Sequence, residues 1–219
     1  MIYAENILIC IAAPLLISLL FIGGKVRLYT AFFCVGMGIC LISAYINGFF
    51  SMAGQMDAEH TAVYISPIIE EVMKFLPLLF YLLLFDPGND GIFMASIAIG
   101  TGFATFENCC YILSSGAERI SYVLIRGLST GVMHVVSILA LALGIMLVLW
   151  LKVLSFPAIA GVLSLSVTFH ALYNLLLSKP GIAADIGYII PVLTAAALYL
   201  PYRNIRREII AGESSPPEG

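Results

Sequence analysis

The chain has 219 residues, of which 61% are hydrophobic and only 11% are charged, and its mean hydropathy is +1.05. A soluble domain with so few polar residues would expose apolar area that aggregates, so the composition excludes the water-soluble class and selects an integral membrane protein. The formal net charge of −3 excludes the strongly basic surface with which proteins bind nucleic acid.

Apolar stretches separated by short polar connections predict an all-α fold, a polytopic transmembrane helix bundle of about seven spans, with eight as the upper count. A helix needs about 20 apolar residues to cross the hydrocarbon. The expected spans cover residues 4–23, 28–50, 63–85, 91–113, 121–150, 153–178 and 181–201. Residues 1–202 are expected to form a single transmembrane domain, and the polar residues 203–219 a short, disordered cytoplasmic tail.

The distribution of basic residues predicts the orientation of the bundle, because cytoplasmic connections carry more Lys and Arg. With seven spans, one side carries Lys25, Arg27, Lys152, Arg203, Arg206 and Arg207, and the other side carries Arg119 and Lys179. The first side is expected to be cytoplasmic. The C-terminus would then lie inside, the N-terminus outside, and the connection 51–62 at the exterior.

Polar residues of a kind that is rare in membrane spans occur in four consecutive spans. They are Glu70, Glu71 and Lys74 in the third span, Glu107 and Asn108 in the fourth, Arg126 and His134 in the fifth, and His170 and Asn174 in the sixth. An ionisable side chain near the bilayer centre costs roughly 2.5–3.5 kcal/mol, so such residues normally face the bundle interior and mark a functional site. Counted from the outer ends of their spans at 1.5 Å per residue, they lie roughly 8–20 Å below the exterior face. We therefore expect them to meet at one level in the outer half of the membrane.

The spacing of these residues predicts several of their contacts. Lys74 follows Glu70 by four residues and Glu71 by three, so it can pair with either carboxylate. The two glutamates point about 100° apart and cannot fill the same role. His170 and Asn174 share a helix face and can both donate to a single oxygen.

Arg126 and Glu107 lie in neighbouring spans, and we expect them to form an ion pair between helices. This pair would hold the fourth and fifth spans together. Two histidines at matching depth beside carboxylates favour a functional site over a packing role.

Carboxylates and imidazoles at one level fit the hydrolysis of an amide. A carboxylate with an imidazole can take a proton from water, and an imidazole with an amide can stabilise an oxyanion. The same residue types also bind zinc, although the HExxH motif is absent from the sequence. The alternatives are a metal-binding sensor and a non-enzymatic transporter or immunity and binding protein. A transporter would extend polar residues into the cytoplasmic half of the spans, where few occur.

Four segments match a known family in their order along the chain. They are PIIEEVMKFLP (67–77), GFATFENCCYIL (102–113), IRGLSTGVMHVV (125–136) and TFHALYNLL (168–176). Together they resemble the PrsW family of bacterial intramembrane proteases, relatives of the Abi and CAAX-processing glutamate-type proteases. The resemblance implies a peptidase of the bacterial inner membrane. It also implies that the substrate is a single-pass transmembrane anti-sigma factor, cut first near its extracytoplasmic face in a stress response.

The resemblance also implies roles for the matched residues. In the CAAX-processing relatives a Glu–His pair activates water and a His–Asn pair stabilises the oxyanion. The catalytic candidates are Glu70, Glu71, His134, His170 and Asn174, and the supporting candidates are Lys74, Glu107, Asn108 and Arg126. The candidate zinc ligands are Glu71, His134 and His170. Which glutamate is the general base stays open, and so does the use of a metal. The expected partners are the anti-sigma factor and membrane lipid, without nucleic acid.

Overall fold

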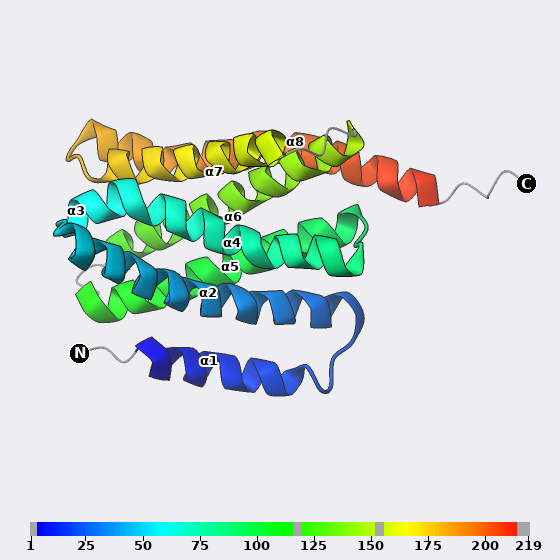
Figure 1. Ribbon diagram of the computed structural model, residues 1–219, viewed down its shortest axis with the longest axis horizontal. Helices are drawn as coiled ribbons and strands as arrows, with labels where there is room; N and C mark the ends of the chain where they lie inside the picture. Colours follow the sequence, from blue (N-terminus) through cyan, green and yellow to red (C-terminus); the bar gives the residue numbers. More distant parts are fainter. Residues whose placement is uncertain (1–3, 116–119, 152–155, 214–219) are drawn as a thin grey trace, which may run out of the picture.

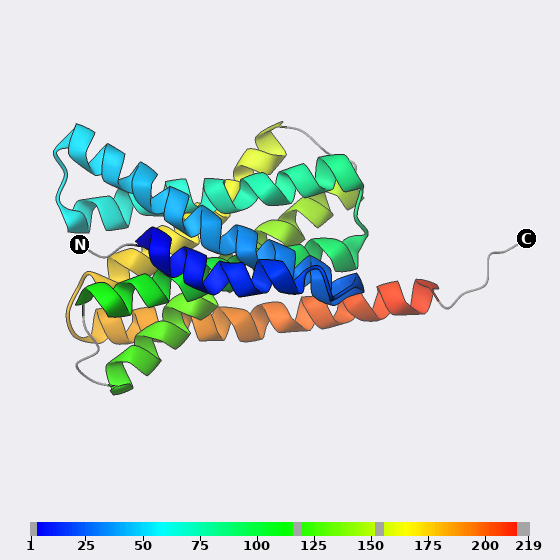
Figure 2. The same cartoon turned by 90° about the horizontal axis from the view of Figure 1, so that it is seen from below.

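The protein is a bundle of long helices that run side by side along one axis (Figures 1 and 2). The computed structural model describes residues 4–115, 120–151 and 156–213. In chain order the elements are α1 (Ala4–Ser18), α2 (Gly24–Gly54), α3 (Ala58–His60), the π-helix η1 (Thr61–Ile65), α4 (Ser66–Phe85), α5 (Asn89–Ser115), α6 (Ile120–Trp150), α7 (Phe156–Leu177) and α8 (Ile182–Glu213). The described ranges contain no strand, which confirms the all-α prediction.

Five helices are long and apolar enough to cross a membrane, namely α2, α5, α6, α7 and the part of α8 from Ile182 to Leu200. Helix α4 has 20 residues, the length of a span, but it is not among these five helices. It carries three of the predicted site residues, all of which are charged types. Helix α1 has 15 residues and is about 22 Å long, which is shorter than the hydrocarbon layer of about 30 Å. The chain is thus a multi-pass membrane protein, and the prediction of about seven spans is supported for five helices.

Two connections differ from the prediction. Helix α1 ends at Ser18 and not at residue 23, and the turn that follows leads to Gly24, whose φ of 56° is a conformation that favours glycine. The predicted connection 51–62 is mostly helical, since α2 continues to Gly54 before the left-handed Gln55 ends it. The carboxylate of Asp57 then accepts a hydrogen bond from the backbone amide of His60 (2.7 Å) and caps the N-terminus of α3.

Helix α8 continues to Glu213, so it includes residues 203–213 of the expected tail. The segment RNIRREIIA contains neither Gly nor Pro, so nothing in it stops the helix. Residues 214–219 lie outside the described residues, as do Arg119 and Lys152, which entered the charge count.

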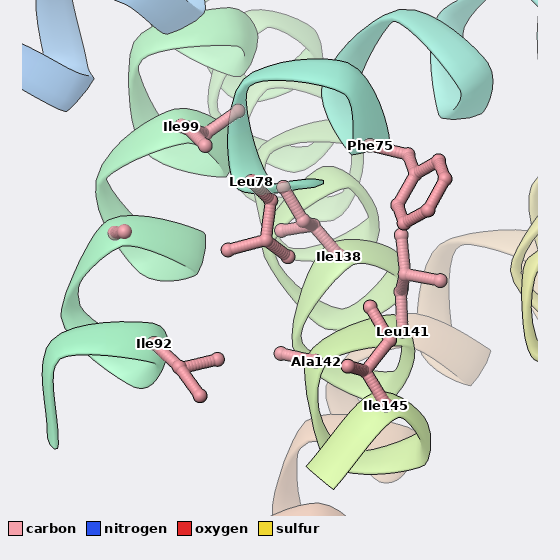
Figure 3. Packing of buried hydrophobic residues seen from close by; sticks show 9 residues of the cluster. Phe75, Leu78, Ile92, Ile99, Ile138, Leu141, Ala142 and Ile145 are labelled. Carbon is pink, nitrogen blue, oxygen red and sulfur yellow. The ribbon is translucent and has the colours of Figure 1, made fainter. Parts of the chain in front are cut away.

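An apolar cluster joins α4, α5 and α6 and fixes their rotation (Figure 3). It contains Phe75 and Leu78 of α4, Ile92, Ala95 and Ile99 of α5, and Ile138, Leu141, Ala142 and Ile145 of α6. On α4 the apolar residues continue the face that carries Glu71 and Lys74, at positions i, i+3, i+4 and i+7. On α6 they continue the face of His134 in the same way. Packing of this cluster therefore turns the polar residues toward one another.

Helices α2 and α5 approach each other closely at two glycines. A Cβ atom on Gly102 would collide with the carbonyl oxygen of Phe33, and one on Gly36 would collide with that of Ile99. Small residues of this kind let the backbones of membrane helices pack against each other.

We expect Gly102→Ala to destabilise the bundle by about 1–3 kcal/mol, the usual cost of overpacking, because α2 must move away from α5. Thermal unfolding in detergent, followed by circular dichroism, measures the effect. Gly38→Ala is the matched control, because a Cβ there meets no atom of the described residues within 4 Å. Equal unfolding temperatures for the two variants would contradict the close approach of the helices.

Candidate active site

The polar residues of α4, α5, α6 and α7 meet in one cluster, as the sequence predicts. Lys74 Nζ lies 3.2 Å from His134 Nδ1, and His170 Nδ1 lies 2.8 Å from Glu71 Oε1. The imidazole of His134 also contacts the carboxylate of Glu107. One network therefore connects all four helices.

Glu71 lies at the centre of this network and is completely buried. Its Oε1 accepts hydrogen bonds from Lys74 Nζ (2.6 Å) and from His170 Nδ1 (2.8 Å). Two serine hydroxyls complete the shell, with Ser137 on Oε1 (3.1 Å) and Ser166 on Oε2 (2.9 Å). Three of these donors meet at Oε1 and one at Oε2, so both Glu71 oxygens have hydrogen-bond partners.

Glu70 lies in a different environment, as its rotation of about 100° along the helix requires. Its Oε1 accepts from Asn47 Nδ2 of α2 (3.2 Å), and its Oε2 lies 3.8 Å from His170 Nε2. Unlike Glu71, it lines a cavity. The predicted pairing of Lys74 with one of the two glutamates is thus confirmed for Glu71.

His134 is held on both sides of its ring. The Lys74 ammonium donates toward Nδ1 (3.2 Å), so the hydrogen of the neutral ring lies on Nε2, which contacts Glu107. The ring packs on Phe103, with centroids 4.7 Å apart, and stands at 89° to the ring of His170, with centroids 5.1 Å apart. These contacts fix the orientation of the imidazole.

Arg126 forms the predicted interhelical pair with Glu107, with 3.8 Å between Nη2 and Oε1. Its Nη1 donates to Asn108 Oδ1 (3.1 Å), and the guanidinium lies 3.2 Å from the centroid of the Tyr111 ring. Asn108 in turn donates to the carbonyl oxygen of Gly127 (3.2 Å). The arginine is therefore held by three neighbours of α5 at the edge of the cluster.

A cavity of about 340 Å³ opens beside the cluster. Its polar lining includes Glu59, Ser66, Glu70, Glu107, Arg126, Thr130, His170, Tyr173, Asn174 and Ser178. A larger cavity of about 540 Å³ lies between α5, α6 and α8, but Asn108 is the one predicted site residue among those that line it. Most of the predicted site residues that line a cavity line the smaller one, which is therefore the candidate active site.

Asn174 lies at the rim of the smaller cavity, one helical turn beyond His170. Its Nδ2 donates to the carbonyl oxygen of Ala62 (2.9 Å) in the π-helix η1. Glu59 and Lys179 form an ion pair (3.1 Å) at the same end of the bundle. The two contacts tie η1 and α3 to the end of α7.

Three polar neighbours were not among the sequence candidates. Ser137 follows His134 by three residues and Ser166 precedes His170 by four, so helical spacing places both on the faces of the histidines. That spacing was the available signal for the serines. For Asn47 the signal was an amide within an apolar stretch.

The side chains with ligating atoms within 4.8 Å of one another are Glu70, His134 and His170. Glu70 thus takes the place that the sequence prediction gave to Glu71, which is fully buried and whose Oε1 binds Lys74 and His170. His170 has the arrangement typical of a ligand, since Nδ1–H is bound by a carboxylate and Nε2 faces Glu70. At His134 a metal on Nε2 would replace the hydrogen bond to Glu107, and the ring hydrogen would then lie on Nδ1, beside Lys74. The residues present fit a divalent metal.

Comparison with known proteins identifies the family of the chain. A search of curated proteins and a search of solved structures each found no match. The family model described as PrsW family intramembrane metalloprotease matches residues 24–200, a range that contains every residue of the cluster. The chain therefore belongs to the PrsW family of intramembrane metalloproteases, as its four sequence segments indicated.

Proposed function

We propose that the protein cleaves a single-pass transmembrane anti-sigma factor near its extracytoplasmic face, at the cavity beside Glu70 and His170. The observation that carries this proposal is a cavity within apolar helices, lined by the carboxylates of Glu70 and Glu107 and by the imidazole of His170. Membership of a protease family supports peptide-bond hydrolysis. The resemblance of the four segments supports the class of substrate.

The distribution of charge supports the extracytoplasmic position of the site. The start of α2, which carries Lys25 and Arg27, and the C-terminal part of α8, which carries Arg203, are directed to the end of the bundle opposite α3 (Figure 1). The cavity is lined by Glu59 of α3 and by Ala62 of η1. If the basic end is cytoplasmic, the cavity faces the exterior and the outer leaflet.

In the proposed mechanism, Glu70, His134 and His170 would hold a divalent metal, for which we propose zinc. When bound, it supplies Lewis-acid polarisation of the scissile carbonyl. Glu71 fixes the ring of His170 through Nδ1, and Lys74 fixes Glu71. Glu71 therefore acts behind the site, while Glu70 faces the substrate.

The asymmetry of the bundle supports an enclosed site over a transport path. A path for ions needs polar residues through the whole depth of the membrane. Below the cluster, the faces of α4, α5 and α6 carry the packed apolar residues of Figure 3, among them Leu78 and Leu141, which are fully buried.

The test is cleavage in lipid vesicles that contain the purified chain and a single-pass anti-sigma factor, with elemental analysis of the same protein. We expect about one divalent metal per chain and a substrate fragment of the size given by a cut near the outer membrane face. A chelator should remove the metal and the cleavage together, and zinc should restore both, because three ligands of the type that zinc prefers converge here.

Asp90→Asn is the control variant, because Asp90 pairs with the exposed Lys25 at the opposite end of the bundle. It should keep both metal and cleavage. Full cleavage by metal-free protein would contradict the metal assignment. Intact substrate with metal-loaded protein, for every anti-sigma factor tried, would contradict the proposed substrate.

A further inference from the structure

We propose that Glu107 is the carboxylate that carries the proton during peptide-bond hydrolysis, and that Arg126 positions it. This inference rests on the proposed protease function and assigns a catalytic role to a residue whose sequence pattern indicated only a supporting one. It follows from the surroundings of the three glutamates in the cluster.

Accessibility separates the three carboxylates. The side chain of Glu71 is 0% exposed, that of Glu70 is 14% exposed and that of Glu107 is 31% exposed. A proton-transfer group must come within hydrogen-bond reach of the reacting atoms. Glu71 fails this requirement because it lies behind His170, whereas Glu70 and Glu107 both line the cavity.

The contacts of the two accessible glutamates give them different roles. Glu70 faces His170 Nε2 and belongs to the set of three side chains whose ligating atoms converge. Glu107 is not a member of that set. In metal-dependent peptidases the proton carrier is a carboxylate beside the ligands and not one of them, and Glu107 occupies such a position.

The two oxygens of Glu107 are not equivalent. Oε2 contacts Nε2 of His134, the nitrogen that would bind the metal. Oε1 lies 3.8 Å from Arg126 Nη2, which is too far for a hydrogen bond but close enough for attraction between the charges. Oε1 is therefore the oxygen that can accept a proton from the cavity.

Arg126 is rigid enough to act as a positioning residue. Asn108 accepts from its Nη1 (3.1 Å), and the central carbon of its guanidinium lies over the Tyr111 ring, 3.2 Å from the ring centroid. A lysine has the same charge but cannot form this stack and this hydrogen bond together. The position of Glu107 thus depends on the shape of the arginine and not only on its charge.

The proposed step balances without any further reactant. The oxygen of a water molecule forms a bond to the carbonyl carbon of the scissile amide, and one proton of that water passes to Glu107 Oε1. The carbon–nitrogen bond then breaks, and Glu107 returns the proton to the leaving nitrogen. The products are a carboxylic acid and an amine, and Glu107 is a carboxylate again.

The test measures cleavage kinetics of Glu107→Gln in lipid vesicles. We expect kcat to fall about 10³-fold, within the range of general acid–base catalysis, while KM changes less than about twofold. Metal content should stay at the level of the wild-type chain, whereas Glu70→Gln should lose the metal. Arg126→Lys should lower kcat about tenfold, with KM and metal content unchanged. Glu5→Gln, at the exposed start of α1, is the matched control and should cleave at the wild-type rate.

If Glu107→Gln does not fold, Glu107→Asp tests the proposed role of Glu107 instead. Its shorter carboxylate should leave a measurable kcat between those of the wild type and an inactive variant, with unchanged KM. Cleavage at the wild-type rate by either variant, or loss of metal from Glu107→Gln, would overturn this inference while leaving the protease function intact. A wild-type chain that cleaves no anti-sigma factor would instead overturn the proposed function.

Discussion

Cleavage by the His170→Ala variant is expected to be about 10³-fold slower than cleavage by the wild-type chain, because His170 joins both parts of the site. Its Nδ1 binds the buried Glu71 (2.8 Å), and its Nε2 faces Glu70 (3.8 Å) across the cavity. Alanine removes the proposed metal ligand and also removes one of the hydrogen-bond donors to Glu71. The measurement is the rate at which the substrate fragment appears in vesicles, at matched amounts of inserted protein.

His60→Ala is the matched control for this variant. The chain has three histidines, and His60 lies outside the cluster, with its exposed ring beside Tyr64 at a centroid distance of 4.7 Å. We expect this variant to cleave at the wild-type rate. If His170→Ala retained more than a tenth of the wild-type rate, the histidine would be a packing residue and the assignment of the site would be wrong.

The helix boundaries show which parts of the fold the sequence determines by itself. The predicted end of the third span at residue 85 agrees with the end of α4 at Phe85, where Asp86 adopts a left-handed conformation before Pro87. A sharp helix end of this kind is determined by the residues at the break itself, so it can be predicted from the sequence. The end of α8 was not predictable in the same way, because loss of hydrophobicity ends a span but does not end a helix.

The composition of the site could be predicted for a different reason. Charged residues are so costly within apolar helices that their presence already implies a shared interior position, and depth counting placed them at one level. The division of work between Glu70 and Glu71 could not be predicted, since it depends on how α4 is rotated in the bundle. The apolar contacts of Phe75 and Leu78 with α6 set that rotation.

The contribution of Glu107 was also hidden in the sequence. A single glutamate beside an asparagine and an arginine fits an interhelical ion pair equally well. Only the three-dimensional arrangement shows that one oxygen of Glu107 contacts His134, that the other lies near Arg126, and that the residue lines the cavity. The site therefore has a buried part around Glu71 and an accessible part around Glu70 and Glu107.

The buried part predicts a large effect on stability for Lys74→Met. Lys74 is fully buried, and its ammonium donates to Glu71 (2.6 Å) and Ser137 (3.1 Å) and lies 5.1 Å from the centroid of the Phe103 ring. Methionine fills a similar volume but leaves the Glu71 carboxylate without its cation. Removing one partner of a buried ion pair costs about 3–5 kcal/mol, and we expect a loss of this size in the free energy of unfolding, measured by denaturant titration in mixed micelles.

Two further variants separate the buried pair from a general effect of losing a lysine. Lys25→Met removes the cation of the exposed pair with Asp90 (2.8 Å), whose side chains are 69% and 41% exposed, so it should change the free energy of unfolding by less than about 1 kcal/mol. The double variant Lys74→Met, Glu71→Gln should regain most of the lost stability, because the uncompensated charge is gone. It should still cleave slowly, since the glutamine no longer holds His170 as a carboxylate does. A double variant no more stable than Lys74→Met alone would show that the lysine stabilises the bundle by packing and not by its charge.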